Sequence, residues 1–331
     1  MHRLRNLILL PLAALAGCGG VSEAGGGSSG EKLNVVAYST PKEVYETVLP
    51  NFSNTPEGKG VAFSQSYGAS GDQARAVIAG LPTDVVALSL APDIDKLVDE
   101  KLVAPDWSQD EYDGFVSKSV VVLAVRKGNP KNIKTWDDLV KPGVEVVTPN
   151  PLTSGGARWN VMAAYGAKTT TGASPDEGID FLKQLFKNVV VQDKSARESL
   201  QTFAAGKGDV LIAYENEAIT AQQKGEDVEY VIPDETILIE NPIAVAAKSK
   251  NPEKAKALLD YLRGPEAQQV FADKGYRSVR EDMVDASKFP EPSGLFTIAE
   301  VGGWDEVMKR FFDKDQSVMA DINEELGVAS E

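Results

Sequence analysis

Residues 144–165 read Val-Glu-Val-Val-Thr-Pro-Asn-Pro-Leu-Thr-Ser-Gly-Gly-Ala-Arg-Trp-Asn-Val-Met-Ala-Ala-Tyr and join a strand-like run to a helix-like run. The β-branched run Val144–Thr148 predicts a strand, and Gly155–Tyr165 predicts a helix. Between them, the turn Thr153-Ser154-Gly155-Gly156 is made of small residues, which leave the first N–H groups of the helix open to approach. A strand that enters a helix in this way is typical of an α/β fold, in which ligands bind at the carboxyl ends of strands.

Strand-like and helix-like segments alternate on both sides of this stretch, which predicts mostly parallel sheets flanked by helices. Strands are expected at residues 33–38, 61–65, 84–90, 119–126, 144–148, 189–192, 209–214 and 241–247. Helices are expected at residues 41–51, 70–79, 93–100, 155–165, 176–186, 195–205, 252–263 and 265–274, with an amphipathic one near 303–326. The β-rich runs 119–126 and 241–247 are expected to cross between two lobes.

Four turns that precede predicted helices are rich in small residues. They are Tyr38-Ser39-Thr40-Pro41, Gly68-Ala69-Ser70-Gly71, Thr153-Ser154-Gly155-Gly156 and Lys194-Ser195-Ala196-Arg197. A helix N-terminus exposes unpaired N–H groups and the positive end of the macrodipole, and small residues let an anion approach closely. Each turn taken alone is more simply interpreted as ordinary capping. Several such turns converging on one point could hold a dianion without any charged side chain.

The first 32 residues have the composition of an export signal and a tether. A basic head precedes the apolar run Leu7–Leu15, which is about half the length needed to span a bilayer. Leu15-Ala16-Gly17-Cys18 resembles the bacterial lipobox, in which the cysteine is acylated; the alternative is an ordinary signal with an incidental Cys18. We expect a signal peptide at 1–17 and a lipidated Cys18 with a flexible Gly/Ser tether at 18–32, which would anchor the protein to the outside of the cell membrane.

Composition limits the classes of function. The chain has 331 residues and a formal net charge of −15, which becomes about −17 when Arg3 and Arg5 leave with the signal. Nucleic acid is therefore an improbable partner, because duplex binding relies on clustered Lys and Arg. The single histidine is His2 and the single cysteine is Cys18, so the mature chain has neither Ser-His-Asp nor Cys-His nor histidine-zinc chemistry. We expect no enzyme activity, cofactor or metal site, although carboxylate pairs and Ser-Lys chemistry remain open.

Several sequence blocks resemble one known family. Asn150–Asn160 is similar to the signature of the prokaryotic sulfate-binding proteins of ABC importers, and Gly208–Ala218 resembles a second block of that family. Further similar blocks are Ser66–Ala74, Val125–Pro130 and Phe186–Val189. The resemblance extends from about Leu33 to the C-terminus and is less specific between the sulfate and thiosulfate members.

This resemblance implies a two-lobed periplasmic-binding-protein fold of type II that closes over its ligand. We expect lobe 1 at 33–118 plus 247–331 and lobe 2 at 119–246, with two chain crossings at the hinge. The residues that the resemblance implies as ligand-binding, through N–H groups or hydroxyls, are Ser39, Ser70, Ser154, Gly155, Gly156, Ala196 and Tyr214. The implied function is capture of sulfate by a monomeric, lipid-anchored binding protein and its delivery to permease subunits in the membrane.

Tyr214 stands where the family has a tryptophan that supplies the seventh donor. A phenol can accept as well as donate, so thiosulfate or another tetrahedral oxyanion such as molybdate stays open beside sulfate. Sulfate suits a site made only of donors, whereas phosphate keeps a proton that would need an acceptor. Arg158 and Arg197 are expected to pair with carboxylates or carbonyls behind the site.

Two other classes of function remain as alternatives. An exported hydrolase without His or Cys is one, and an adhesive lipoprotein is the other. Adhesion would predict repeats or exposed β-edges, and the sequence shows no internal repeat.

Overall fold

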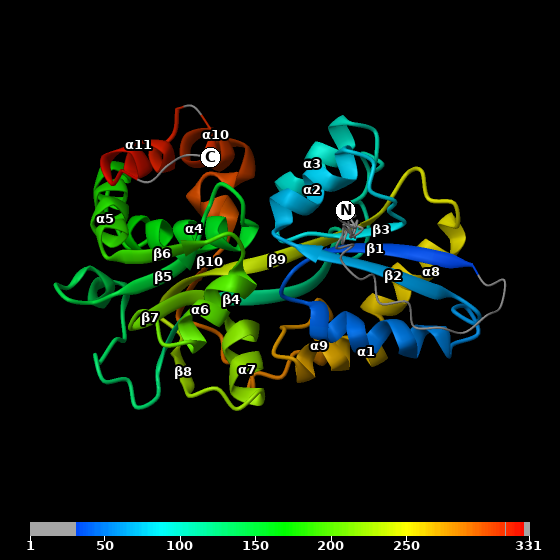
Figure 1. Cartoon of the computed structure of the whole chain (residues 1–331), viewed down its shortest axis with the longest axis horizontal. Coiled ribbons are helices and arrows are strands. Elements are labelled where there is room, and N and C mark those ends of the chain that lie inside the picture. The colour runs from blue at the N-terminus through cyan, green and yellow to red at the C-terminus, as the bar shows by residue number, and fades with distance from the viewer. Residues whose placement is uncertain (1–30, 315, 328–331) are drawn as a thin grey trace, which may run out of the picture.

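The computed structural model describes residues 31–314 and 316–327. The expected signal peptide, Cys18 and nearly all of the tether lie outside these residues. Within them, the strands form one ten-stranded sheet with helices on both faces (Figure 1). The main path of the sheet is β2-β1-β3-β9-β4-β7-β5-β6, while β10 pairs with β9 and β8 pairs with β4.

The first half of the molecule is built on three parallel strands. These are β1 (Lys32–Tyr38), β2 (Ala62–Gly68) and β3 (Val85–Ala87). Its helices are α1 (Lys42–Ser53), α2 (Ser70–Ile78), α3 (Ala91–Asp99), α8 (Pro252–Arg263) and α9 (Pro265–Asp273). Along β1, Val35 packs into a core with α1, α8 and α9, whereas Val36 packs into a separate core with α2 and α3. The strand is thus buried on both faces, which explains its unbroken apolar run.

The second half repeats this plan. Its parallel strands are β5 (Val146–Pro149), β6 (Val189–Asp193) and β7 (Val210–Tyr214). Its helices are α4 (Gly155–Thr169), α5 (Pro175–Lys187), α6 (Ala196–Ala204) and α7 (Glu215–Gln223). The sequence patterns did not predict α7, which begins directly after β7 without a turn. The prediction of mostly parallel pairing is therefore confirmed for β1–β3 and for β5–β7.

Two long strands join the halves, as expected. The strands β4 (Phe115–Arg126) and β9 (Glu235–Val245) pair antiparallel with each other, while β9 also pairs with β3 and β4 with β7. The short strand β8 (Val228–Val231) adds to β4. Among the described strands, every antiparallel pair involves β4 or β9, so the departures from parallel pairing are confined to these crossings.

The C-terminal segment differs from the expectation in its helices. The single amphipathic helix expected near 303–326 is two helices, α10 (Gly303–Phe312) and α11 (Val318–Glu325), and Ser317 caps the second by accepting from the N–H of Ala320. These helices and β10 (Gly294–Phe296) lie against α4 and α5 (Figure 1), sharing one core with them. Residues of 294–326 thus share a core mainly with the second half, while the assignment of 247–331 to one lobe with 33–118 stays a prediction.

We predict that Phe296→Ala lowers the free energy of unfolding by about 3–5 kcal/mol. The ring is only 2% exposed and lies so close to α4 that a Cβ on Gly166 would be 2.2 Å from it. Urea unfolding measures the change, with Val284→Ala as control, since Val284 is 59% exposed. Equal effects of the two substitutions would contradict the proposed packing of the C-terminal segment.

Candidate ligand-binding site

A small enclosed cavity lies between the two halves, where strands end and helices begin. Its lining residues are Tyr38, Ser39, Thr40, Ala69, Ser70, Ser89, Ser154, Gly156, Ala196 and Tyr214. All four turns singled out in the sequence therefore meet at one place. The space open to the centre of a water-sized sphere is about 10 Å³, which is room for one water or one compact ion. No described lining residue carries a charged side chain.

The N-terminus of α4 forms one wall of the cavity. Ser154 caps the helix, and its Oγ accepts from the N–H of Ala157 at 3.3 Å, which leaves the hydroxyl hydrogen free to donate. Gly155 and Gly156 are the first two helical residues, so their N–H groups have no partner within the helix. Space is closed to a side chain at Gly155 and tight at Gly156.

The two glycines meet different neighbours. A Cβ on Gly155 would be 2.2 Å from Leu90 Cδ2 and 2.8 Å from the Ser89 side chain, so Gly155 lies beside the cavity, tight against the first half. A Cβ on Gly156 would be 3.3 Å from Ala196 Cβ and 3.7 Å from the Tyr214 ring. A side chain at Gly156 would therefore occupy the space between two other lining residues.

Two further helix N-termini contribute from opposite halves. In α6, Ser195 Oγ accepts from the N–H of Glu198 at 3.3 Å, which leaves the N–H of Ala196 as the first free donor. In α2, Ser70 is the first helical residue, and its hydroxyl donates to Asp93 at 2.7 Å. The hydroxyl of Ser70 is thus used by the protein, and its N–H remains for a ligand.

Ser89 is a lining residue that the sequence patterns missed. The expected strand 84–90 ran through it, whereas β3 ends at Ala87 and Ser89 lies in a fifth strand-to-helix turn. Its hydroxyl lies 2.7 Å from the hydroxyl of Tyr214, and its N–H donates to Ser70 Oγ at 3.0 Å. The sequence did contain a signal for Ser89, because a serine just before a predicted helix is the same pattern as in the four turns above. Tyr38 and Thr40 also line the cavity from positions next to Ser39.

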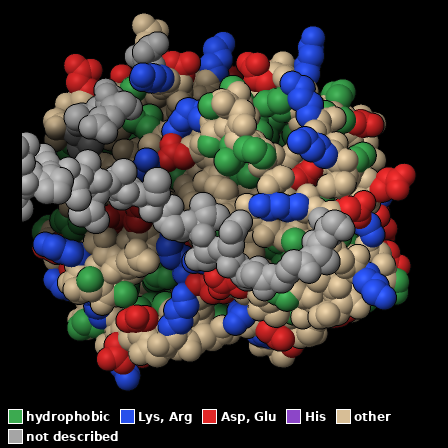
Figure 2. Space-filling view, turned by 45° about the vertical axis from the view of Figure 1, so that its right-hand side comes forward, with side chains coloured by type: hydrophobic (Ala, Val, Ile, Leu, Met, Phe, Trp, Pro, Cys, Tyr) green, Lys and Arg blue, Asp and Glu red, His purple; other side chains and the backbone are tan. Residues whose placement is uncertain are grey.

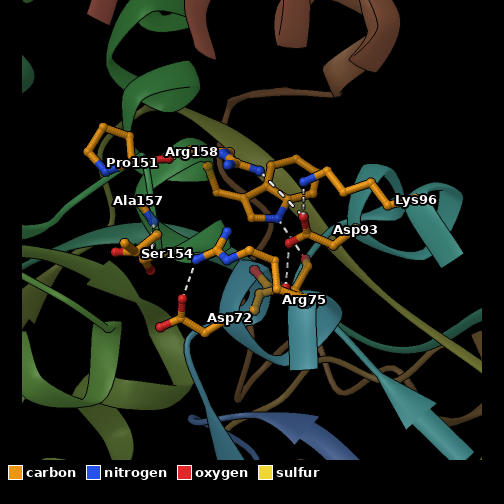
Figure 3. A network of polar contacts seen from close by, with 12 residues as sticks. Asp72, Arg75, Asp93, Lys96, Pro151, Ser154, Ala157 and Arg158 are labelled. Atoms are coloured by element: carbon orange, nitrogen blue, oxygen red, sulfur yellow. Dashed lines mark hydrogen bonds and ion pairs between the residues drawn. The ribbon is translucent and has the colours of Figure 1, made fainter. Parts of the chain in front are cut away.

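Arg158 is engaged by other protein groups, as expected, and its side chain points toward Asp93 (Figure 3). Its Nε donates to the carbonyl of Pro151 at 2.9 Å, and its Nη1 lies 3.5 Å from Asp93 Oδ1. Burial favours a higher pKa for Asp93, but Arg158 and Lys96 together hold the pKa below its ordinary value. The buried charges of Asp93 and Arg158 thereby compensate each other behind the lining residues of the cavity.

Arg197 is also engaged behind the site, as expected. Its guanidinium donates to both carboxylate oxygens of Glu43, at 2.7 and 2.5 Å, and to the carbonyl of Thr40 at 3.0 Å. Burial pushes the pKa of Glu43 upward, but hydrogen bonds from Arg197 and Lys224 lower it to about 2. Neither arginine is therefore free to bind a ligand as a counter-ion in this conformation.

Glu217 is a buried carboxyl close to the cavity wall. Its Oε2 accepts only a long, 3.5 Å hydrogen bond from the N–H of Tyr214, and its Oε1 has no hydrogen-bond partner in the described structure. Burial raises its pKa to about 7, although Arg197 acts in the opposite direction. The neighbouring Glu215 pairs instead with Arg277 at 2.8 Å, so the two carboxyls do not form a pair with each other.

The fold and the cavity together define a class of protein: two halves joined by two strands, enclosing a small polar site. Residues 33–277 match the family model described as "Bacterial extracellular solute-binding protein". The "Sulfate-binding protein" of Synechococcus elongatus is 43% identical over 325 residues, covering 92% of this chain and 93% of that protein. The "Thiosulfate-binding protein" of Escherichia coli is 37% identical and covers 83% of this chain and 86% of its own length.

Solved structures agree with this match. The sulfate-binding protein SubI from Mycobacterium tuberculosis H37Rv superposes with a TM-score of 0.82 at 43% identity, covering 86% of this chain and 100% of that one. The chain therefore belongs to the bacterial extracellular solute-binding proteins and, within them, to the sulfate-binding protein family. In the described residues, no helix combines the length and the apolar content needed to cross a membrane.

We predict that Glu217→Gln removes a pH dependence of stability between about pH 4.5 and pH 7. The folded state retains a proton there that an unfolded glutamate, with its ordinary pKa of 4.5, has released, so wild-type stability falls as the pH rises through this window. The difference between wild type and variant should grow by roughly 3 kcal/mol from pH 4 to pH 8. Urea unfolding across that range measures it, with the exposed Glu229→Gln as control. A constant difference would show that folding leaves the pKa of Glu217 unchanged.

Proposed function

We propose that this chain captures sulfate between two lobes and delivers it to the permease of an ABC importer. The observation that supports this most directly is the enclosed cavity at which helix N-termini from both halves meet without a charged lining side chain. Sulfate is a full dianion at neutral pH and needs only donors. Oriented N–H groups in a closed, water-poor space stabilise such an ion strongly.

The ligand contacts are part of this proposal. The N–H groups of five residues and two hydroxyls would donate to the anion: Ser39, Ser70, Gly155, Gly156 and Ala196 through the backbone, Ser154 and Tyr214 through the side chain. Phosphate would bring a proton into a site whose described lining residues include no carboxylate. Asp93 and Glu43 behind it are already engaged, and Glu217, whose Oε1 lacks a partner, is not a lining residue. An unpaired buried proton donor is costly, so phosphate should be rejected.

Thiosulfate is the second candidate. The hydroxyls of Ser89 and Tyr214 lie 2.7 Å apart, and either can be the donor. Two rotatable hydroxyls can adapt to a terminal sulfur, which is larger and a weaker acceptor than oxygen. The similarity to a thiosulfate-binding protein agrees with this option.

The remaining parts of the proposal concern organisation. We propose that the closing lobes are 33–118 with 247–293, and 119–246 with 294–326, because the latter segment shares a core with α4 and α5. The protein would act as a monomer without enzyme activity. Lipidation of Cys18 would hold it at the outer face of the cell membrane, within reach of its permease.

Calorimetric titration with sulfate, thiosulfate, molybdate and phosphate tests the proposal in its simplest form. Sulfate or thiosulfate should bind with micromolar or tighter affinity, and phosphate should bind far more weakly. Absence of binding to all four anions would overturn it.

We predict that Gly156→Asp abolishes sulfate binding while the protein stays folded. The new carboxylate would lie between Ala196 and Tyr214, and a like charge against the anion costs several kcal/mol, which corresponds to about a thousandfold in affinity. Calorimetry and circular dichroism measure the two properties. Val284→Asp adds the same charge at an exposed position and should bind normally. Retained sulfate affinity in Gly156→Asp would show that the N-terminus of α4 does not bind the ligand.

We predict that Tyr214→Phe weakens sulfate binding about ten- to hundredfold, because it deletes one hydrogen bond to a charged ligand and leaves Ser89 without its hydroxyl partner. The ratio of sulfate to thiosulfate affinity, measured by calorimetry, shows whether the phenol sets the preference. Tyr230→Phe, on β8 in the same half, is the control. Unchanged affinity in Tyr214→Phe would exclude the hydroxyl as a donor.

A further inference from the structure

Four of the ion pairs that join the two halves share one polarity, and they lie around the cavity. In the described residues four such pairs connect the helices and turns of one half to those of the other: Arg158–Asp93, Lys194–Asp72, Arg197–Glu43 and Lys224–Glu43. In each of them the cation belongs to the second half and the carboxylate to the first. Two pairs at or beside the crossing strands have the opposite polarity. In Arg277–Glu215 the cation belongs to the first half, and Arg277 pairs through its backbone with Lys118 of β4. Lys118 itself pairs with Glu240 of β9.

The four cations depend on closure more than two of the three carboxylates do. The third carboxylate, Glu43, has its described ion-pair partners in the second half. Asp93 also pairs with Lys96 at 2.8 Å, and Asp72 also pairs with Arg75, so both keep a partner within the first half. Among the described residues, no ion pair joins any of the four cations to a carboxylate of the second half. Separation of the halves would therefore leave these four cations without their ion-pair partners, and Arg197 would keep only the electrostatic influence of Glu217.

These cations surround the donors of the second half. Lys194 and Arg197 flank Ala196 in the turn that opens α6, and Arg158 follows Gly156 by two residues in α4. Lys194 and Lys224 are 66% and 50% exposed even in the closed molecule. On the face seen in Figure 2, basic and acidic side chains are interspersed and form no single basic patch.

A local cationic face would solve a physical problem of this protein. Its formal net charge of −15 repels a dianion at long range, and the cavity itself offers no cation. A patch of one sign in a cleft can raise the association rate of an oppositely charged ligand by about 10- to 1000-fold. Closure would then pair the cations with carboxylates, which leaves the bound anion in a neutral site.

We propose that the oxyanion binds first to the second half, attracted by Arg158, Lys194, Arg197 and Lys224, and that the carboxylates of the first half then pair with these cations to hold the lobes closed. This inference rests on the proposed function and assigns the two halves different tasks in it. Charges at the rim of an interface act mainly on association rates, whereas the partners that they meet on closure act mainly on dissociation.

Stopped-flow fluorescence with sodium sulfate tests the inference. Trp159 in α4 donates its Nε1–H to the carbonyl of Ser89 in the first half at 2.9 Å, so its emission should report closure. The association rate of the wild-type protein should fall as KCl is added, because salt screens the local cations. If the net charge controlled the approach of sulfate, the rate would rise with salt, and the inference would be wrong.

Variants separate the two tasks. Lys194→Gln/Lys224→Gln should associate about tenfold more slowly at low salt, and the difference should shrink at high salt. Lys183→Gln/Lys256→Gln changes the net charge equally at lysines that pair elsewhere, with Glu325 and Asp260, and should associate like wild type. Glu43→Gln should associate at least as fast as wild type and dissociate about tenfold faster.

The outcomes also distinguish this inference from the proposed function. Equal slowing by the two double variants, or slower association of Glu43→Gln, would overturn the inference while sulfate binding in calorimetry still stood. A wild-type protein that bound no sulfate would overturn both.

Discussion

Unpaired N–H groups at helix N-termini impose the constraint on which the rest of this structure depends. A buried backbone donor needs an acceptor, and the first N–H groups of a helix have none within it. Gly155, Gly156 and Ala196 present such groups beside or at a closed cavity, and Ser70 presents one from the opposite half. An anion without protons would satisfy all of them together, and the proposed ligand contacts rest on this match.

The sheet brings these donors together. In each half, parallel strands lead into helices, so the helix N-termini lie at the strand ends. The antiparallel pair of β4 and β9 then joins one half to the other through β3 and β7. In the described part of the sheet these two long strands make the crossings, and the chain passes between the proposed lobes once more after residue 293. The other contacts between the halves lie mainly at the helix ends. The C-terminal helices are covered by the second half, which adds to its core.

Charge is kept out of the cavity and placed directly behind it. Arg158 and Arg197 each contact a carbonyl of a turn next to the site and a carboxylate of the first half. Pairs buried in this way contribute little net stability, because desolvation offsets much of the attraction. Their common polarity is more informative than their number, since it gives the two halves opposite electrostatic character around a neutral ligand site.

The sequence by itself determined the α/β alternation, the two crossing strands and the turns around the site, because strand propensity, capping residues and paired glycines act over a few neighbouring residues. The helix N-terminus at Ser154-Gly155-Gly156 could be predicted in this way, and a family resemblance indicated the other proposed ligand-binding residues. Only the tertiary structure decided that Ser89 faces Tyr214, that residues 294–326 pack on α4 and α5, and that Arg197 meets Glu43. These contacts join residues as many as 154 positions apart, and no local pattern encodes which distant partner will cover an apolar face or neutralise a charge.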